Sequence, residues 1–100
     1  MANPSLKVPA DELADVCRRY RVRELALFGS AARGQAGPGS DLDLLVEFQP
    51  GAHIGFLALA ALGRELSALL GRRVDLVPKR GLKPLIRDEV LREAEVVFAA

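Results

Sequence analysis

Residues 41–48 read DLDLLVEF, in which two aspartates, one residue apart, stand at the head of an apolar run. Successive side chains of a β-strand point to opposite faces, so a strand here divides its residues into two sets. Asp41 and Asp43 share one face, and the other face carries the apolar set Leu42, Leu44, Val46 and Phe48. The apolar set predicts a strand that packs on a core. The two carboxylates need a positive partner, because like charges repel and burying an unpaired charge is costly.

The sequence on either side of this strand alternates between helical and extended patterns. Apolar stripes at helical spacing predict three helices, over residues 10–20, 54–70 and 82–94. Apolar runs bounded by Gly and Pro predict three strands, over residues 23–28, 41–48 and 72–78. A short helical turn is expected over 30–33, and an edge strand or docked tail over 96–98. This order predicts a layered α/β or α+β domain, with the four phenylalanines as core candidates: Phe28, Phe48, Phe56 and Phe98.

The composition is that of an ordinary globular protein. The chain has 100 residues, of which 50% are hydrophobic and 27% charged, so one domain over 1–100 is expected. The net charge of +1 does not indicate nucleic-acid binding. With one cysteine, Cys17, and no apolar run of membrane-spanning length, a cytoplasmic protein is expected. A homo- or hetero-oligomer could complete a site that this chain begins.

The Gly-rich stretch before the aspartates fails the common ligand-binding motifs. Gln35 stands where a P-loop needs its lysine, and Leu42 takes the place of the third glycine of a dinucleotide fingerprint. Leu45 occupies a position where an EF-hand loop needs an oxygen ligand. Cys17 and His53 have no partners that would complete a zinc site.

A third aspartate repeats the anomaly of the first two. Asp75 sits between Val74 and Leu76 in a predicted strand. Carboxylates that converge from two strands can hold Mg²⁺, which prefers oxygen ligands and usually keeps substrate phosphates as well. Gly29 at a strand end lets backbone approach a ligand closely, and the turn after it can present N–H groups to an anion. Ser30 and Arg33 are then candidates for contacts with phosphate.

These residues resemble the minimal nucleotidyltransferase (MNT) family, within the DNA-polymerase-beta-like nucleotidyltransferase superfamily. The family signature is Gly-Ser, a spacer, Asp-x-Asp, and a third Asp on a later strand. This chain matches it over nearly its whole length, at Gly29-Ser30, Asp41-Leu42-Asp43 and Val74-Asp75-Leu76. The resemblance implies a nucleotidyltransferase fold, with a small mixed β-sheet flanked by helices, and an enzyme that uses ATP and Mg²⁺.

The resemblance also implies a role for each matching residue. Asp41, Asp43 and Asp75 would be metal ligands, and Asp75 would also help to activate the attacking hydroxyl. Gly29 and Ser30 would hold the triphosphate, together with Arg33, whose position is often basic in the family. Every core position of the motif is matched, so the resemblance implies an active enzyme.

Members of this family commonly accompany a HEPN-domain ribonuclease toxin. The resemblance therefore implies an antitoxin that adenylylates a tyrosine of its HEPN partner, binds the partner, or does both. A binding-only antitoxin stays an alternative, carried by the helix over 54–70 and the arginine clusters. A small-molecule or RNA acceptor is less favoured, because the sequence shows no further domain to grip it.

Overall fold

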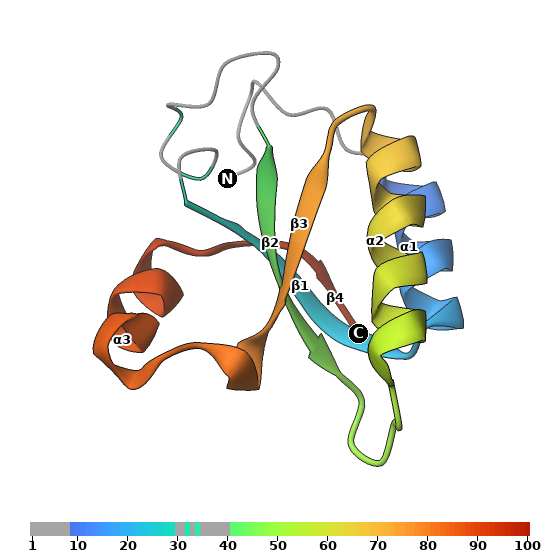
Figure 1. Ribbon diagram of the computed structural model, residues 1–100. Coiled ribbons are helices and arrows are strands. Elements are labelled where there is room, and N and C mark those ends of the chain that lie inside the picture. Colours follow the sequence, from blue (N-terminus) through green and yellow to red (C-terminus); the bar gives the residue numbers. More distant parts are fainter. Residues whose placement is uncertain (1–8, 30–31, 33, 35–40) are drawn as a thin grey trace.

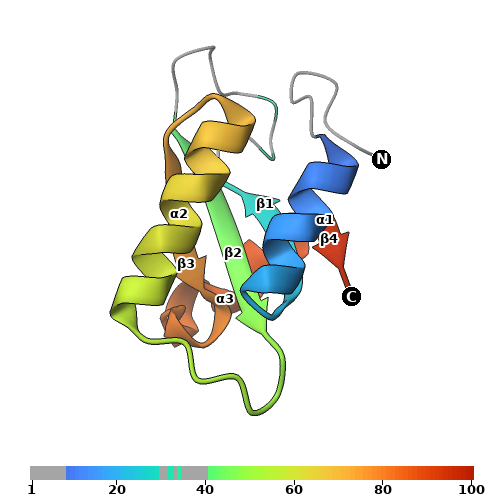
Figure 2. The same cartoon turned by 90° about the vertical axis from the view of Figure 1, so that its right-hand side faces the viewer.

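The computed structural model describes residues 9–29, 32, 34 and 41–100, and shows a four-stranded sheet with helices on both sides. Helices α1 and α2 cover one face of the sheet, and α3 stands on the other side (Figures 1 and 2). In chain order the elements are α1 (Ala10–Arg19), β1 (Val22–Phe28), β2 (Leu42–Phe48), α2 (Phe56–Leu70), β3 (Val74–Pro78), the 3-10 turn η1 (Lys79–Gly81), α3 (Pro84–Glu93) and β4 (Glu95–Ala99). The predicted helices and strands are confirmed within two residues at nearly every end.

The sheet is mixed, with strand order β3-β2-β1-β4. β1 pairs antiparallel with both β2 and β4, whereas β2 and β3 run parallel. A parallel pair needs a crossover connection, and α2 supplies it. The segment at 96–98 is therefore an edge strand, as one of the two predictions for it stated. β2 lies between β3 and β1, so side chains from both of these strands can lie beside its own.

The core lies between the sheet and the α1–α2 layer. Leu13, Val16 and Cys17 form the buried stripe of α1, and Leu62 and Leu66 form that of α2. The strands add a buried apolar set: Val22, Leu25, Leu27, Leu42, Leu44 and Val46. Full burial of each leucine or valine contributes about 1.5–3 kcal/mol. The apolar face predicted for residues 41–48 is confirmed, and it fixes which way the alternate residues of β2 point.

A hydrogen-bonded cluster of side chains joins the exposed rims of α1 and α2. Arg19 Nη2 donates to Glu65 Oε1 at 2.7 Å, and the hydroxyl of Tyr20 donates to the other carboxylate oxygen. The hydrogen bond from Arg19, and then that from Tyr20, lower the pKa of Glu65. We call these three residues the α1–α2 clamp. Its charges are satisfied within the chain, so it needs no ligand.

Two apolar features differ from the expectation. Phe56 was expected in the core, but its side chain is 81% exposed, because it lies outside the stripe that α2 buries with Leu62 and Leu66. The apolar side of α3 is also uncovered, with Leu85 98% exposed. α3 has no buried residue, and Figure 1 shows it standing away from the sheet. The sequence pattern of α3 predicted a helix, but it did not predict that the apolar side of this helix is exposed.

Cys17 is a core residue rather than a reactive one. Its side chain is fully buried, and desolvation raises the pKa of the thiol to about 11. A thiol that stays protonated and inaccessible is a poor nucleophile and a poor metal ligand. In the part of the chain that the structure describes, no helix combines the length and apolarity that a membrane crossing requires.

Candidate functional site

Asp43 and Asp75 lie side by side on the sheet face that α1 and α2 leave uncovered. In the parallel pairing of β2 with β3, Asp43 and Asp75 are direct register partners. Their neighbours in the sequence, Leu42 and Leu44, are buried in the core, so the aspartates point to the opposite face. Asp41 precedes the first residue of β2 and is exposed. The convergence of carboxylates predicted from two strands is thus present at the start of β2 and β3.

The backbone of Gly29, directly after β1, lies against the side chain of Asp43. It follows β1 directly and has a φ of +74°, a conformation that costs L-residues with a side chain. A Cβ at this position would lie 2.5 Å from Asp43 Oδ2, well inside contact distance. Glycine is therefore required here for two separate reasons, its backbone angle and the space that the carboxylate occupies. The close approach that the structure shows is to the side chain of Asp43, and the expected approach of Gly29 to a ligand stays a prediction.

The surroundings of Asp43 disfavour its negative charge. Desolvation by burial raises the pKa of its carboxyl group, and the charges of Asp75 and then Asp41 raise it further. Phe28 is the register partner of Asp43 on β1, so its ring stands on the same face and helps to exclude water. The sequence analysis placed Phe28 in the core, whereas the structure places it beside the aspartates. Within the part of the chain that the structure describes, no basic group lowers the pKa of Asp43, so its charge is not neutralised there.

The donor chemistry fits a divalent cation. Asp41, Asp43 and Asp75 offer only oxygen ligands, which Mg²⁺ prefers, and one or two carboxylates with substrate phosphates are enough to hold it. Within the described ranges, however, no three His, Cys, Asp or Glu side chains already stand together as a metal-binding group. A cation would stabilise the charge of Asp43, which desolvation by burial and then the charges of Asp75 and Asp41 disfavour, and the pairing of Asp43 with Asp75 is the observation on which the fit rests.

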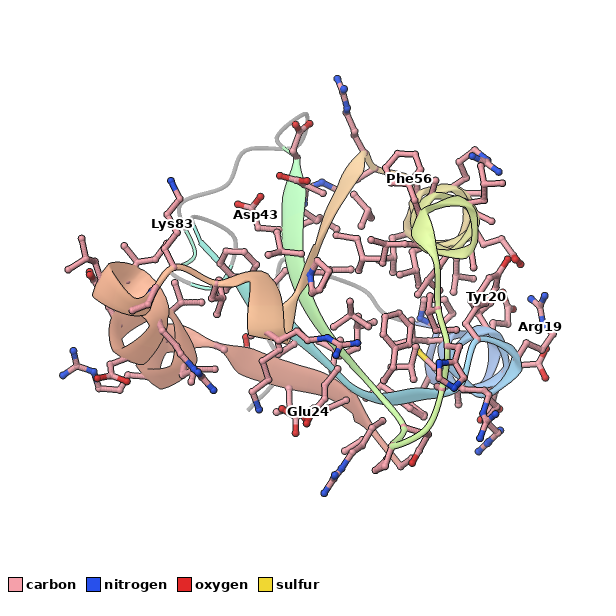
Figure 3. The ribbon with its side chains drawn as sticks, turned by 60° about the horizontal axis from the view of Figure 1, so that its bottom comes forward. Arg19, Tyr20, Glu24, Asp43, Phe56 and Lys83 are labelled. Atoms are coloured by element: carbon pink, nitrogen blue, oxygen red, sulfur yellow. The ribbon has the colours of Figure 1, made fainter. Side chains whose placement is uncertain are left out.

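The hydroxyl and basic residues that could contact phosphate are placed differently from the aspartates. Ser30 and Arg33, predicted to contact phosphate, fall outside the part of the chain that is described. Lys79 and Arg80 follow β3, and since Asp75 lies at the start of that strand, they are at the opposite end of the sheet. Figure 3 places Lys83, at the start of α3, on the same side of the sheet as Asp43. The sequence analysis missed Lys83, because no local pattern connects it to the aspartates.

Comparison with known proteins places this geometry in a family. The profile of the family described as "Nucleotidyltransferase domain" matches residues 11–97. The protein adenylyltransferase MntA of Thermococcus cleftensis is 47% identical over 79 residues, which cover 79% of this chain and 78% of the relative. Sequence similarity therefore spans both aspartate-bearing strands.

Solved structures agree on the fold. A candidate minimal nucleotidyltransferase is 46% identical, with a TM-score of 0.71 over 85% of each chain. A toxin–antitoxin complex with AMP-PNP superposes with a TM-score of 0.74 at 21% identity, over 93% of this chain and 75% of that one. A tri-AMPylated HEPN toxin of Shewanella oneidensis in complex with its MNT antitoxin gives 0.64 at 19% identity, over 91% and 70%. At these lower identities the likeness concerns the fold.

Proposed function

This chain belongs to the nucleotidyltransferase domain family and is a nucleotidyltransferase, and from that premise we propose that it transfers AMP from ATP to a hydroxyl of a partner protein. The observation that carries the proposal is the register pairing of Asp43 with Asp75 beside Gly29. It gathers the carboxylates and a glycine with a positive φ at one end of the sheet face opposite α1 and α2. Phosphoryl chemistry needs that combination, because catalysis rests mostly on positioning and charge stabilisation.

Asp41, Asp43 and Asp75 are the residues that would hold Mg²⁺. When bound, the cation supplies positive charge that offsets the negative charge of the triphosphate during transfer. Asp43 is the central member, because its neighbours on β1 and β3 fix its position and it is the least exposed of the three. Asp75 stands next to it on the edge strand β3, on the side from which an acceptor can approach.

In the proposed reaction the oxygen of the acceptor hydroxyl attacks the α-phosphorus of ATP. The bond from that phosphorus to the bridging oxygen breaks, pyrophosphate leaves, and AMP becomes esterified to the acceptor. Asp75, which is exposed, accepts the hydroxyl proton. Gly29 keeps the space beside Asp43 open, and Ser30 and Arg33 are proposed to bind the phosphates. The acceptor hydroxyl must be held in line with the α-phosphorus and the leaving pyrophosphate, so recognition of the acceptor is part of the catalytic task.

The partner is proposed to be a HEPN-domain toxin, with this chain as its antitoxin. The proposal draws on the relative that is a protein adenylyltransferase and on the structural neighbour in which an MNT antitoxin binds an AMPylated HEPN toxin. A partner protein also suits the open architecture of the site. Asp75 and Asp41 are exposed on an uncovered sheet face, so a tyrosine on another protein can reach them.

A binding-only antitoxin is the second candidate, and one observation favours it. Leu85 and Ile86 on α3 are 98% and 46% exposed, which is typical of residues that become covered in a complex. Under this alternative, complex formation alone would neutralise the toxin. A variant without transfer activity that still binds and still protects cells would favour this candidate over catalysis.

Transfer from α-labelled ATP to a co-expressed HEPN partner tests the proposal. Asp43→Asn keeps the shape of the side chain and removes its charge, so we expect transfer to fall about 100- to 1,000-fold. Asp11→Asn is the matched control, because Asp11 is an exposed aspartate on α1, which covers the opposite face of the sheet, and its variant should transfer AMP normally. Undiminished transfer by the Asp43 variant would rule out the mechanism.

A further inference from the structure

A basic concavity lies at the opposite end of the sheet face that carries the aspartates. Its volume is about 550 Å³, and it is formed where β2 and β3 end. The turn after β2, the 3-10 turn η1 and one side of α3 make up its walls. Figure 3 views the molecule with this end turned forward. Neither the sequence motifs nor the proposed transfer reaction accounts for it.

Positive charge is concentrated in this concavity. The whole chain is nearly balanced, with 14 Lys and Arg against 13 Asp and Glu. Four cationic side chains line the concavity against one carboxylate, that of Glu47: Arg23, Lys79, Arg80 and Arg87. They come from β1, η1 and α3, so only the fold brings them together. Glu24 is paired with Glu47 in the register of β1 and β2, but it does not line the concavity.

The carboxylate inside the concavity leaves most of this charge uncompensated. Lys79 Nζ lies 3.4 Å from Glu47 Oε1, and this ion pair uses the acid that is present. Among the described residues, Arg23, Arg80 and Arg87 enter no ion pair and no side-chain hydrogen bond. The α1–α2 clamp shows the contrast, because its arginine is fully engaged by Glu65. Three uncompensated arginines on one concave surface attract anions, since a cleft of one sign focuses the field.

The chemistry of these cations favours carboxylates on a protein. The planar fork of arginine matches a carboxylate with two parallel hydrogen bonds. Single-stranded nucleic acid would need exposed aromatic rings on which to stack its bases. Phe48 is the aromatic residue of the concavity and is packed against the core, while the exposed Phe56 lies on the other side of the sheet (Figure 3). Leu85 and Ile86 are exposed on the same helix as Arg87, which suits a protein surface with apolar contacts.

The position of the concavity connects it to the aspartates. Asp43, Leu45 and Glu47 share one face of β2 because they alternate along the strand. Glu47 lies four positions after Asp43 on the strand, which is about 13 Å at 3.3 Å per residue. The middle of this face is covered, because Leu45 is only 4% exposed. A protein segment held in the concavity can therefore reach the aspartate end only by passing over this cover, and it presents a hydroxyl there.

We propose that the basic concavity holds an acidic segment of the protein that accepts the nucleotide. This inference rests on the proposed function for the identity of the acceptor, but the binding that it describes does not require catalysis. Arg23, Arg80 and Arg87 supply the affinity, and the distance along β2 sets where the acceptor hydroxyl lies. The concavity thus separates recognition of the acceptor from the chemistry at the aspartates.

A peptide titration tests the binding directly. A decaglutamate peptide is added to ¹⁵N-labelled protein, and amide shifts are followed by NMR for the wild type and for Arg87→Glu. We expect shifts at Arg23, Arg80 and Arg87, and binding about tenfold weaker in the variant. Arg92→Glu is the matched control, because Arg92 lies on the same helix and has the same charge but does not line the concavity. That control should bind the peptide as the wild type does.

Three results would overturn the proposal. An equal loss in both variants would mean that the peptide follows overall charge, and tighter binding of an oligouridylate decamer at the same residues would make the concavity a nucleic-acid site. With an active HEPN acceptor, Arg87→Glu should raise the KM for the acceptor and leave the KM for ATP unchanged. A raised KM for ATP alone would assign the concavity to the nucleotide. The peptide titration remains decisive if no transfer is found, and Asp43→Asn should leave it unchanged.

Discussion

Opposite charges gather at the two ends of the sheet face that lies away from α1 and α2. At the start of β2 and β3, Asp43 and Asp75 are register partners, and the backbone at Gly29 crowds the first of them. Where the strands end, the arginines of the basic concavity come from separate elements and stay exposed. The acidic end is built from paired residues of two neighbouring strands and from the glycine after β1. The basic end is built from residues of β1, η1 and α3 that only the fold brings together. This difference suits a small cation at one end and a segment of a protein at the other.

The largest structural effect is expected at the acidic end, from Gly29→Ala. The added methyl group would meet Asp43 Oδ2 at 2.5 Å, and the φ of +74° would strain any residue with a Cβ. We expect the free energy of unfolding to fall by about 1–3 kcal/mol and transfer activity to be lost, because the carboxylate must move. Chemical denaturation and the transfer assay measure the two effects.

Gly71→Ala separates the two causes. Gly71 caps α2 with a φ of +66°, and nothing lies within 4 Å of the Cβ that alanine would add. This variant should lose less stability than Gly29→Ala, because only the strain of the backbone angle applies, and it should keep its transfer activity. If both variants kept their activity, the close approach of Gly29 to Asp43 would have no part in the function, and the acidic end would not be the tight site that the comparison assumes.

The smallest effect is expected at the α1–α2 clamp, whose charges are already satisfied. Because the pKa of Glu65 is lowered in the folded protein, its contribution to stability is present above the ordinary glutamate pKa and is lost as the pH falls through the lowered value. Glu65→Gln should therefore reduce the unfolding midpoint slightly at pH 7, with a smaller difference from the wild type in acid. Thermal unfolding from pH 7 down to pH 3 measures this.

The α1–α2 clamp lies away from both ends of the sheet face that carries the aspartates. Glu65→Gln should change neither nucleotide transfer nor binding of the acidic peptide, because the clamp joins α1 and α2 on the covered side of the sheet. A marked loss of either activity would mean that the covered side contributes to function. The separation of function into the two ends of the open face would then be wrong.

The acidic end could be predicted from the sequence because local pattern determines it. Alternation along residues 41–48 fixed which side chains enter the core, so Asp43 had to point to the other face. Asp75 followed by the same argument on β3. Their register pairing could not be predicted, since it depends on the parallel crossover through α2. Phe28 was placed on the wrong face, because an apolar strand end does not reveal which layer covers it.

The basic concavity could not be predicted, because its residues share no local pattern. Arg23 and Arg87 are far apart in the sequence, and only the antiparallel sheet and the position of α3 bring them to one surface. The exposure of Leu85 was missed for a related reason. A helical apolar stripe predicts a face that needs cover, but not whether this chain or a partner supplies the cover.

The central claim is that the aspartates form a cation-dependent nucleotide site, and thermal unfolding of wild type and Asp43→Asn tests it most directly. Without metal, the variant should unfold at a slightly higher temperature than the wild type, because it lacks the charge that desolvation by burial and then Asp75 disfavour. With Mg²⁺ and a non-hydrolysable ATP analogue at about 100 times the dissociation constant, the wild type should gain about 2.7 kcal/mol and the variant little, so the order reverses. If the ligands stabilise both proteins equally, the aspartates do not form the site.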